Sequence, residues 1–272
     1  MLLISSYLLR SCASSETVDA PWNKTALPVV FSIITPDRPV KVYLSKSVIN
    51  SASPEKAPYP EAKVFISEGN DVWIEIPRLK VDTNLFVDVQ HLIPIKMGNS
   101  YALKVVLAHT TVSAQTTLPA KKATILEVSC TEGLDTNAMA FDGNFECVFC
   151  KIDMKFQKPL ENNNQYLVNS YDLDLLNTPV NIVLTSSNYQ SDEFCWPKDS
   201  TAANISLHTI DPRISDFVKA QEITNTLTID NILFSLLFGY RGVLPTYSNI
   251  INGVGLFSYY LSDTKRVELK KR

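Results

Sequence analysis

The feature that most constrains the fold is an alternation of apolar and polar residues in short segments across residues 28–119. Val40, Val42 and Leu44 alternate with more polar residues, and residues 101–107 repeat the pattern. Successive side chains of a β-strand point to opposite faces, so this alternation places one set of side chains in a core. Turn-forming clusters separate about seven such segments, which predicts a β-sandwich of immunoglobulin-like size.

The second half, residues 124–272, predicts a β-rich domain with one or two short helices, so the whole chain is expected to be all-β. The strand-like segments are Thr124–Val128, Asn144–Phe156, Tyr166–Val168, Val180–Leu184 and Gly253–Tyr260, before a basic, solvated tail at Lys265–Arg272. A helix is expected after Asp211 as the N-cap, with Pro212 in its first position. Pro119 and two following lysines interrupt the strand pattern, which predicts a domain boundary at residues 119–124.

The N-terminus carries a short apolar run, Leu2–Leu9, that ends shortly before Cys12. This arrangement is typical of a bacterial lipoprotein signal, in which a peptidase cuts before the cysteine and the thiol carries the lipid. Residues 1–11 are then the signal peptide, and residues 12–27 are a flexible tether. The run is short and no basic residue precedes it, so an ordinary N-terminal segment with one apolar patch is the alternative. The lipoprotein interpretation predicts a mature chain that starts at Cys12 and is held at a membrane by its acyl chains.

The cysteine count agrees with export. The five cysteines are Cys12, Cys130, Cys147, Cys150 and Cys195, and lipidation of Cys12 leaves an even set of four for disulfides. A redox CxxC needs a helix N-terminus, whereas Cys147 and Cys150 lie in a strand-like run. Positions i and i+3 of a strand face opposite sides, so these two are not expected to bond to each other. A zinc site is the remaining alternative, although no second closely spaced pair exists.

No pattern predicts an enzyme, a metal site or a cofactor. The three histidines, His91, His109 and His208, belong to no metal-binding or nucleophile motif. Asp172 and Asp174 match a glycosidase pair by residue type alone, because their spacing is that of simple strand alternation.

Two further patterns are weak as functional signals. Gly253 and Gly255 resemble a phosphate-binding GxG, but no helix follows, which favours a bulge or a close backbone approach. The net charge is −3 with Lys and Arg scattered along the chain, which argues against nucleic-acid binding.

Residues 187–197 are the candidate recognition segment. They read as a polar loop that carries aromatic rings, with Tyr189, Phe194 and Trp196 as the candidate binding residues beside Asn188 and Gln190. Rings offer contact area and amides offer hydrogen bonds, as in many recognition surfaces. The alternative is that Phe194 and Trp196 simply pack over a loop held by Cys195.

Five segments together resemble one family. They are the run before Cys12, Val40–Ser47, the Pro-rich Ala57–Ile66, Thr116–Pro119, and Pro245–Phe257 with its Tyr-Ser-Asn-Ile and Gly-x-Gly-x-Phe elements. In this order they resemble the lipoproteins of Bacteroidota called domain of unknown function 4249. The resemblance covers nearly the whole mature chain, and it departs from the family at the apolar stretch Ile232–Phe238 and at the truncated signal.

The resemblance implies a lipid-anchored outer-membrane location, exposed on the cell surface or, as the alternative, facing the periplasm. Members of the family are often encoded beside a TonB-dependent transporter, and the resemblance carries over no catalytic residue. The leading hypothesis is therefore a binding or accessory lipoprotein that assists nutrient uptake. A structural or adhesive surface module is the second hypothesis, and a hydrolase is the third.

Overall fold

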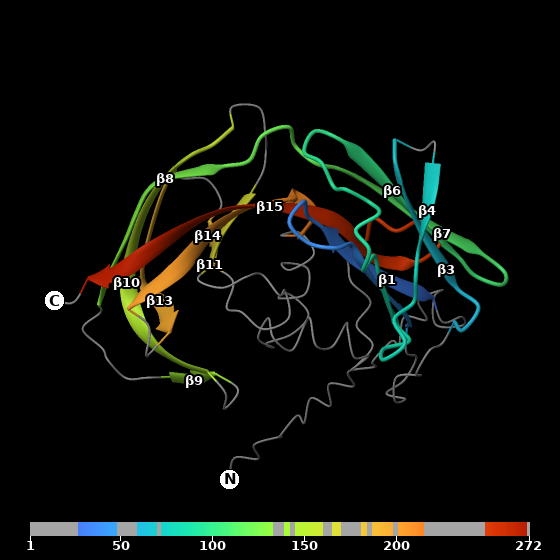
Figure 1. Cartoon of the computed structure of the whole chain (residues 1–272), viewed down its shortest axis with the longest axis horizontal. Helices are drawn as coiled ribbons and strands as arrows, with labels where there is room; N and C mark the ends of the chain where they lie inside the picture. Colours follow the sequence, from blue (N-terminus) through green and yellow to red (C-terminus); the bar gives the residue numbers. More distant parts are fainter. Residues whose placement is uncertain are drawn as a thin grey trace, which may run out of the picture.

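The structure is a computed structural model that describes residues 27–47, 59–69, 72–132, 139–141, 145–159, 165–169, 181–183, 187–197, 201–214 and 248–270. Fifteen strands and one helical turn make up the secondary structure of these residues, so the all-β prediction is confirmed. The strands form one sheet of eleven strands and one of four. Strands β1 to β7 lie at one end of the molecule and most of the others lie at the opposite end (Figure 1).

The first half is built from seven strands in two layers. These are β1 (Pro28–Ile34), β2 (Lys41–Lys46), β3 (Lys63–Glu68), β4 (Val72–Ile76), β5 (Leu85–Val87), β6 (Ser100–Val106) and β7 (Thr111–Thr117). One layer has the order β1-β2-β5 and the other has the order β4-β3-β6-β7.

A shared core joins the two layers. Val42 of one layer and Ile66 of the other are fully buried, and both belong to the same cluster. The predicted alternation is confirmed at Val40, Val42 and Leu44, which are all buried. The sandwich arrangement agrees with the prediction, and its immunoglobulin-like topology stays a prediction.

The second half forms most of the larger sheet. Its strands are β8 (Thr124–Glu132), β9 (Met139–Phe141), β10 (Phe145–Gln157), β11 (Gln165–Asn169), β12 (Asn181–Val183), β13 (Asn188–Pro197) and β14 (Ala202–Ile210). The long strand β10 pairs with β8 on one side and with β13 on the other. Four of these strands, β8, β10, β11 and β12, match predicted segments.

The prediction of a loop at residues 187–197 is wrong, because residues 188–197 form β13. Pairs such as Gln190 with Asp153 and Cys195 with Phe149 give this segment a nearly continuous row of backbone partners on β10. Strand formation depends on cross-strand pairing and packing more than on intrinsic preference. The neighbouring strand therefore overrides the polar composition that suggested a loop.

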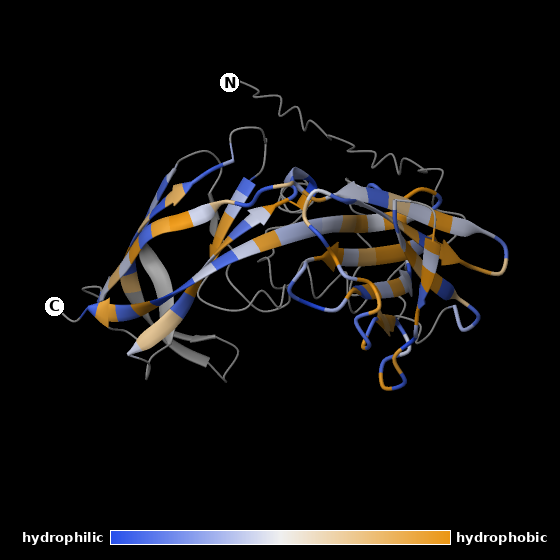
Figure 2. Cartoon of the chain, turned by 45° about the horizontal axis from the view of Figure 1, so that its top comes forward, coloured by the Kyte–Doolittle hydropathy of each residue, from blue (hydrophilic) through white to orange (hydrophobic). Residues whose placement is uncertain are grey.

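The last strand, β15 (Val254–Lys270), belongs to both halves of the molecule. Its first part pairs in parallel with β1, its second part pairs antiparallel with β14, and its end pairs in parallel with β8. Figure 2 shows that β15 is more hydrophobic beside β1 and mostly hydrophilic toward the C-terminus. The tail expected from Lys265 is thus part of a strand as far as Lys270, although Lys265 and Lys270 themselves are exposed.

Beyond the predicted boundary, the chain also contributes to the first core. Ile250, Phe257 and Tyr259 lie in the same buried cluster as Val42 and Ile66. The end of the chain therefore completes the first sandwich. The domain boundary at residues 119–124 stays a prediction, and any fragments cut there are expected to remain associated through β15.

Candidate functional site

Three neighbouring strands of the second half, β8, β10 and β13, line a pocket of about 650 Å³. We call it the β10 pocket. Its lining residues are Glu127, Val128, Ser129, Asp153, Met154, Lys155, Asn188 and Gln190. The volume falls within the range of about 300–1,000 Å³ that is typical of small-ligand sites.

The strand register assembles the polar residues of the β10 pocket into two rows. In one row Asp153 lies between Ser129 and Gln190. In the next row Lys155 lies between Glu127 and Asn188. Alternate residues of a strand share a face, so all six lie on one face of the sheet.

The opposite face of the same strands is apolar. Met154 is 2% exposed and belongs to a buried cluster, against which Val128 and Tyr189 pack. This burial fixes which side of the sheet each residue occupies, because a slip by one residue would move Met154 out of the core. The core therefore holds the polar rows in place.

The β10 pocket offers hydroxyl, amide, carboxylate and ammonium groups to a ligand. Lys155 Nζ lies 3.0 Å from Glu127 Oε2, and both side chains are more than 60% exposed. An exposed ion pair of this kind contributes little to stability, so its groups can turn to a ligand at small cost. The arrangement suits a polar ligand that accepts and donates several hydrogen bonds.

The structure assigns different positions to the candidate binding residues. Tyr189 packs against the core, whereas its neighbours Asn188 and Gln190 line the β10 pocket. Phe194 and Trp196 occupy β13 opposite Cys150 and Val148, and their side chains lie outside the described part of the chain. The predicted segment thus contributes its amides to a pocket, while the one ring that is described does not line it.

Sequence reasoning missed the contributions of β8 and β10 to the β10 pocket. Glu127, Asp153 and Lys155 lie in segments that were predicted as strands, and Ser129 lies one residue beyond the predicted end of the first of them. Their alternation with buried residues was the available sequence signal for these positions. The adjacency of β8, β10 and β13 could not be predicted from the sequence, because pairing between distant strands leaves no local pattern.

A second hollow of about 660 Å³ lies in the first half. Its lining includes the apolar Ile66 and Ile93 and the acidic Glu68. The carboxylate of Glu68 accepts hydrogen bonds from Lys96 and Asn99. The Glu68 carboxylate is therefore already hydrogen-bonded within the protein, which makes this hollow a weaker candidate for a ligand site than the β10 pocket.

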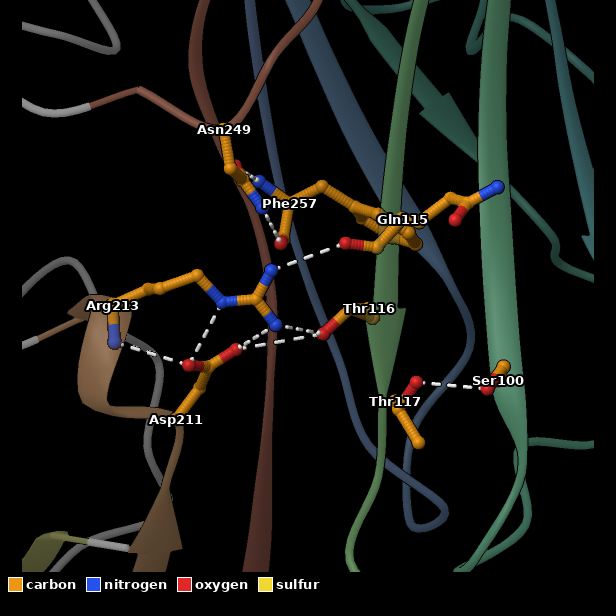
Figure 3. Close-up of polar contacts among 8 residues, drawn as sticks. All are labelled: Ser100, Gln115, Thr116, Thr117, Asp211, Arg213, Asn249 and Phe257. Carbon is orange, nitrogen blue, oxygen red and sulfur yellow. Dashed lines mark hydrogen bonds and ion pairs between the residues drawn. The ribbon is translucent and has the colours of Figure 1, made fainter. Parts of the chain in front are cut away.

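A charged cluster at the junction of the two halves has a structural role (Figure 3). Asp211 is 3% exposed, and its Oδ1 accepts hydrogen bonds from the backbone N–H of Arg213 at 3.0 Å and from Arg213 Nε at 2.9 Å. The guanidinium also donates to the Gln115 carbonyl and to Thr116 Oγ1 on β7.

The bond from the Arg213 N–H confirms Asp211 as the predicted N-cap, while the rest of the predicted helix lies outside the described residues. The cluster joins the segment after β14 to the first sandwich.

The most specific part of the family resemblance also has a structural role. The Asn249 side chain accepts from the Phe257 N–H at 2.9 Å and donates to its carbonyl at 2.7 Å (Figure 3). Gly255 has a φ of +126°, and a Cβ there would lie only 1.9 Å from the Val30 carbonyl oxygen. The close backbone approach expected at Gly255 is confirmed, and the motif holds the start of β15 beside β1.

His208 and Ser262 form a pair that looks like part of a catalytic site. Their Nδ1 and Oγ atoms lie 2.7 Å apart across directly opposite positions of β14 and β15. His208 is 2% exposed, and burial, with a smaller contribution from Arg38, lowers its pKa to about 3. Such a weak base does not match the near-neutral pKa that general-base catalysis needs. The other two histidines, His91 and His109, are exposed on turns.

The buried His208 predicts a pH dependence of stability. The folded pKa of about 3 lies below the unfolded value of about 6.5, so the unfolded chain binds the extra proton first. Stability is then fully present above pH 6.5 and falls as the pH drops toward 3, by about 2 kcal/mol at pH 5. Urea unfolding at pH 7.5 and pH 5.0 should show this loss in the wild type and not in His208→Gln. Equal losses in the two proteins would contradict the assignment.

The described residues contain no group of three or more side chains that could hold a metal ion. Within the same residues, no helix is long and apolar enough to span a membrane. No protein-family model matches the chain, and a search of curated proteins finds no relative. The family resemblance and the functional hypotheses therefore stay predictions.

Proposed function

We propose that the chain is a lipid-anchored outer-membrane protein that works by binding, as an accessory module of a TonB-dependent transporter in nutrient uptake. The observation that carries the binding role is the β10 pocket, where six polar side chains from three strands converge on one hollow. Ligand sites of this size usually place a few convergent polar groups in a mostly apolar lining, so the mainly polar lining of the β10 pocket favours a strongly polar ligand.

The anchor and the partner rest on the sequence. Cys12 and the tether as far as residue 26 lie outside the described residues, and they support attachment through the lipoprotein signal and the odd cysteine count. The transporter partner rests on the family resemblance. The immunoglobulin-like class of the first sandwich is part of the same proposal.

Catalysis is the weaker alternative. The His208–Ser262 pair is the closest approach to a nucleophile and base among the described residues, and burial keeps that histidine neutral and inaccessible. A structural or adhesive module has one observation in its favour. Strand β15 runs through both halves, which suits a spacer (Figure 1). An adhesive module would bind cells or matrix without any contribution from the β10 pocket.

The test is to capture partners from detergent-solubilised outer membranes with the native protein. Replacing both Asn188 and Gln190 with Ala should weaken capture of a transporter–ligand assembly at least tenfold, since contact residues at an interface centre each contribute on the order of 1–2 kcal/mol. Asn204→Ala is the matched control, because Asn204 is an exposed amide on β14 outside the β10 pocket.

Unchanged capture by the folded double variant would remove the β10 pocket from the binding role. Fractionation of the same cells tests whether Cys12 anchors the chain to the membrane. Cys12→Ser should leave the chain in the soluble fraction, and sedimentation with the outer membrane would contradict lipidation at this residue.

A further inference from the structure

Two buried cysteines of the second half touch each other across neighbouring strands. Cys130 of β8 and Cys150 of β10 are both 0% exposed, and their Sγ atoms lie 3.4 Å apart. Both are thiols in the structure. They belong to one largely apolar cluster with Ile152 and Met154, where the thiol of Cys150 has the thiol of Cys130 as its hydrogen-bond partner.

The strand register explains why these two thiols meet. Cys130 lies opposite Ile152, and Cys150 lies opposite Glu132, so the two cysteines are diagonal neighbours. Diagonal neighbours on one face of an antiparallel pair lie about 7–8 Å apart, and here the two thiols point toward each other across that separation, since their Sγ atoms are 3.4 Å apart.

The other two cysteines have the same relationship. Cys147 lies opposite Pro197, and Cys195 lies opposite Phe149, so Cys147 and Cys195 are also diagonal neighbours, on β10 and β13. The offset has the same direction in both strand pairs. Each of the four cysteines therefore has one cysteine at a diagonal position on an adjacent strand.

We propose that Cys130 and Cys150 form a disulfide, and that the register leaves Cys147 and Cys195 to form the second one. The presence of these bonds in the cell rests on the proposed export of the chain, because disulfides persist in oxidising compartments. The pairing itself rests on the fold. It also agrees with the expectation that Cys147 and Cys150 do not bond to each other.

The chemistry is thiol–disulfide exchange. The thiolate of one cysteine attacks an oxidant disulfide, such as glutathione disulfide or that of a dithiol oxidoreductase, and one oxidant thiol leaves. The second cysteine thiolate then attacks the mixed disulfide and releases the other oxidant thiol. Two electrons pass from the two cysteines to the oxidant, and the two cysteine protons end on the two released thiols.

The bond is expected to form while β8 and β10 come together during folding. Closing it brings the Sγ atoms about 1.4 Å nearer, to the usual length near 2.05 Å. The pairing of β10 with β13 already shifts register between Cys150 and Ile152, and such an irregularity lets a strand bend. In the finished fold both thiols are inaccessible to an oxidant, and the neighbouring thiol and burial raise the pKa of Cys130.

The experiment is to refold the reduced full chain in a mixture of reduced and oxidised glutathione. The product is alkylated and digested without reduction by a Glu-specific protease together with chymotrypsin. Cuts after Glu127, Glu132 and Phe149 separate the peptides of Cys130, Cys147 and Cys150. We expect one linked peptide pair that joins Cys130 to Cys150, and a second that joins Cys147 to Cys195. A link from Cys130 to Cys147 or Cys195 would overturn the pairing, as would free thiols at 130 and 150 in the folded protein.

A variant isolates the buried pair. In Cys12→Ser/Cys147→Ala/Cys195→Ala only Cys130 and Cys150 remain, so refolding should lower the mass by two hydrogens and raise Tm by roughly 5–10 °C over the reduced protein. Adding Cys130→Ser is the control and should abolish both effects.

Export is tested separately by lysing cells directly into an alkylating agent, which fixes the thiols as they are in the cell. If Cys130 and Cys150 are free thiols in this sample but form a disulfide in the refolded protein, the pairing stands and the proposed export is overturned.

Discussion

Gly255→Ala should prevent the first and last strands of the chain from pairing. Gly255 lies opposite Val30 in the parallel pairing of β1 with β15. A Cβ at this position would lie 1.9 Å from the Val30 carbonyl oxygen and 2.8 Å from its carbonyl carbon. Both atoms belong to the backbone, so no side-chain rotation relieves the clash. The φ of +126° adds strain for any residue with a Cβ.

The expected loss in unfolding free energy is more than about 4 kcal/mol. Single substitutions rarely cost this much, and those that do include severe backbone strain. Urea unfolding followed by tryptophan fluorescence measures it, and low soluble yield is the expected companion.

Gly69→Ala is the matched control for this prediction. Gly69 also has a positive φ, of +75°, but a Cβ there meets nothing within 4 Å. Its replacement should therefore cost only the conformational strain, about 1–2 kcal/mol. A loss at Gly255 no larger than the loss at Gly69 would show that β1 and β15 tolerate separation. It would also remove the structural explanation of the Gly-x-Gly element.

The local alternation of residues was enough to predict strands of the first sandwich such as β2 and β6. Val40, Val42 and Leu44 are buried as expected, because a strand with one buried face needs no distant information to reveal that face. The position of β15 needs such information. Its neighbour β1 lies at the other end of the chain, and the Asn249 side chain that steadies its start bonds to the backbone of Phe257. Every residue has the same backbone groups, so a hydrogen bond to the backbone cannot be predicted from the identity of the partner residue.

The candidate site was only partly predictable for the same reason. The amides of Asn188 and Gln190 stood out by composition, and the structure places them in the β10 pocket. Composition alone could not show that residues 188–197 form a strand, since that strand depends on β10 for its pairing. Tyr189 was grouped with its polar neighbours although alternation turns it to the core. Had residues 188–197 been predicted as a strand, the same alternation would have separated Tyr189 from Asn188 and Gln190.

The second large effect is expected at the junction of the two halves, from Arg213→Ala. The Asp211 side chain is only 4% exposed, and Arg213 Nη2 lies 2.6 Å from its Oδ2. Removing the guanidinium leaves a buried carboxylate without its cation, and it also removes the donor to the Gln115 carbonyl and a donor to Thr116 Oγ1 on β7. Breaking a fully buried pair in this way costs about 3–5 kcal/mol. Because the Arg213 side chain is 28% exposed, water can reach the site, and we expect a loss of about 2–4 kcal/mol.

A double variant shows whether the unpaired charge causes this loss. In Asp211→Asn/Arg213→Ala the buried group is a neutral amide, which keeps an oxygen for the Arg213 backbone N–H and no longer carries an isolated charge. Urea unfolding should then recover at least about 1 kcal/mol relative to Arg213→Ala. Lys96→Ala is the control for an ion pair at the surface, because Lys96 is 57% exposed beside Glu68 and its removal should cost less than about 1 kcal/mol. If Arg213→Ala and Lys96→Ala lose the same free energy, the junction owes its stability to the strand pairing of β15 alone.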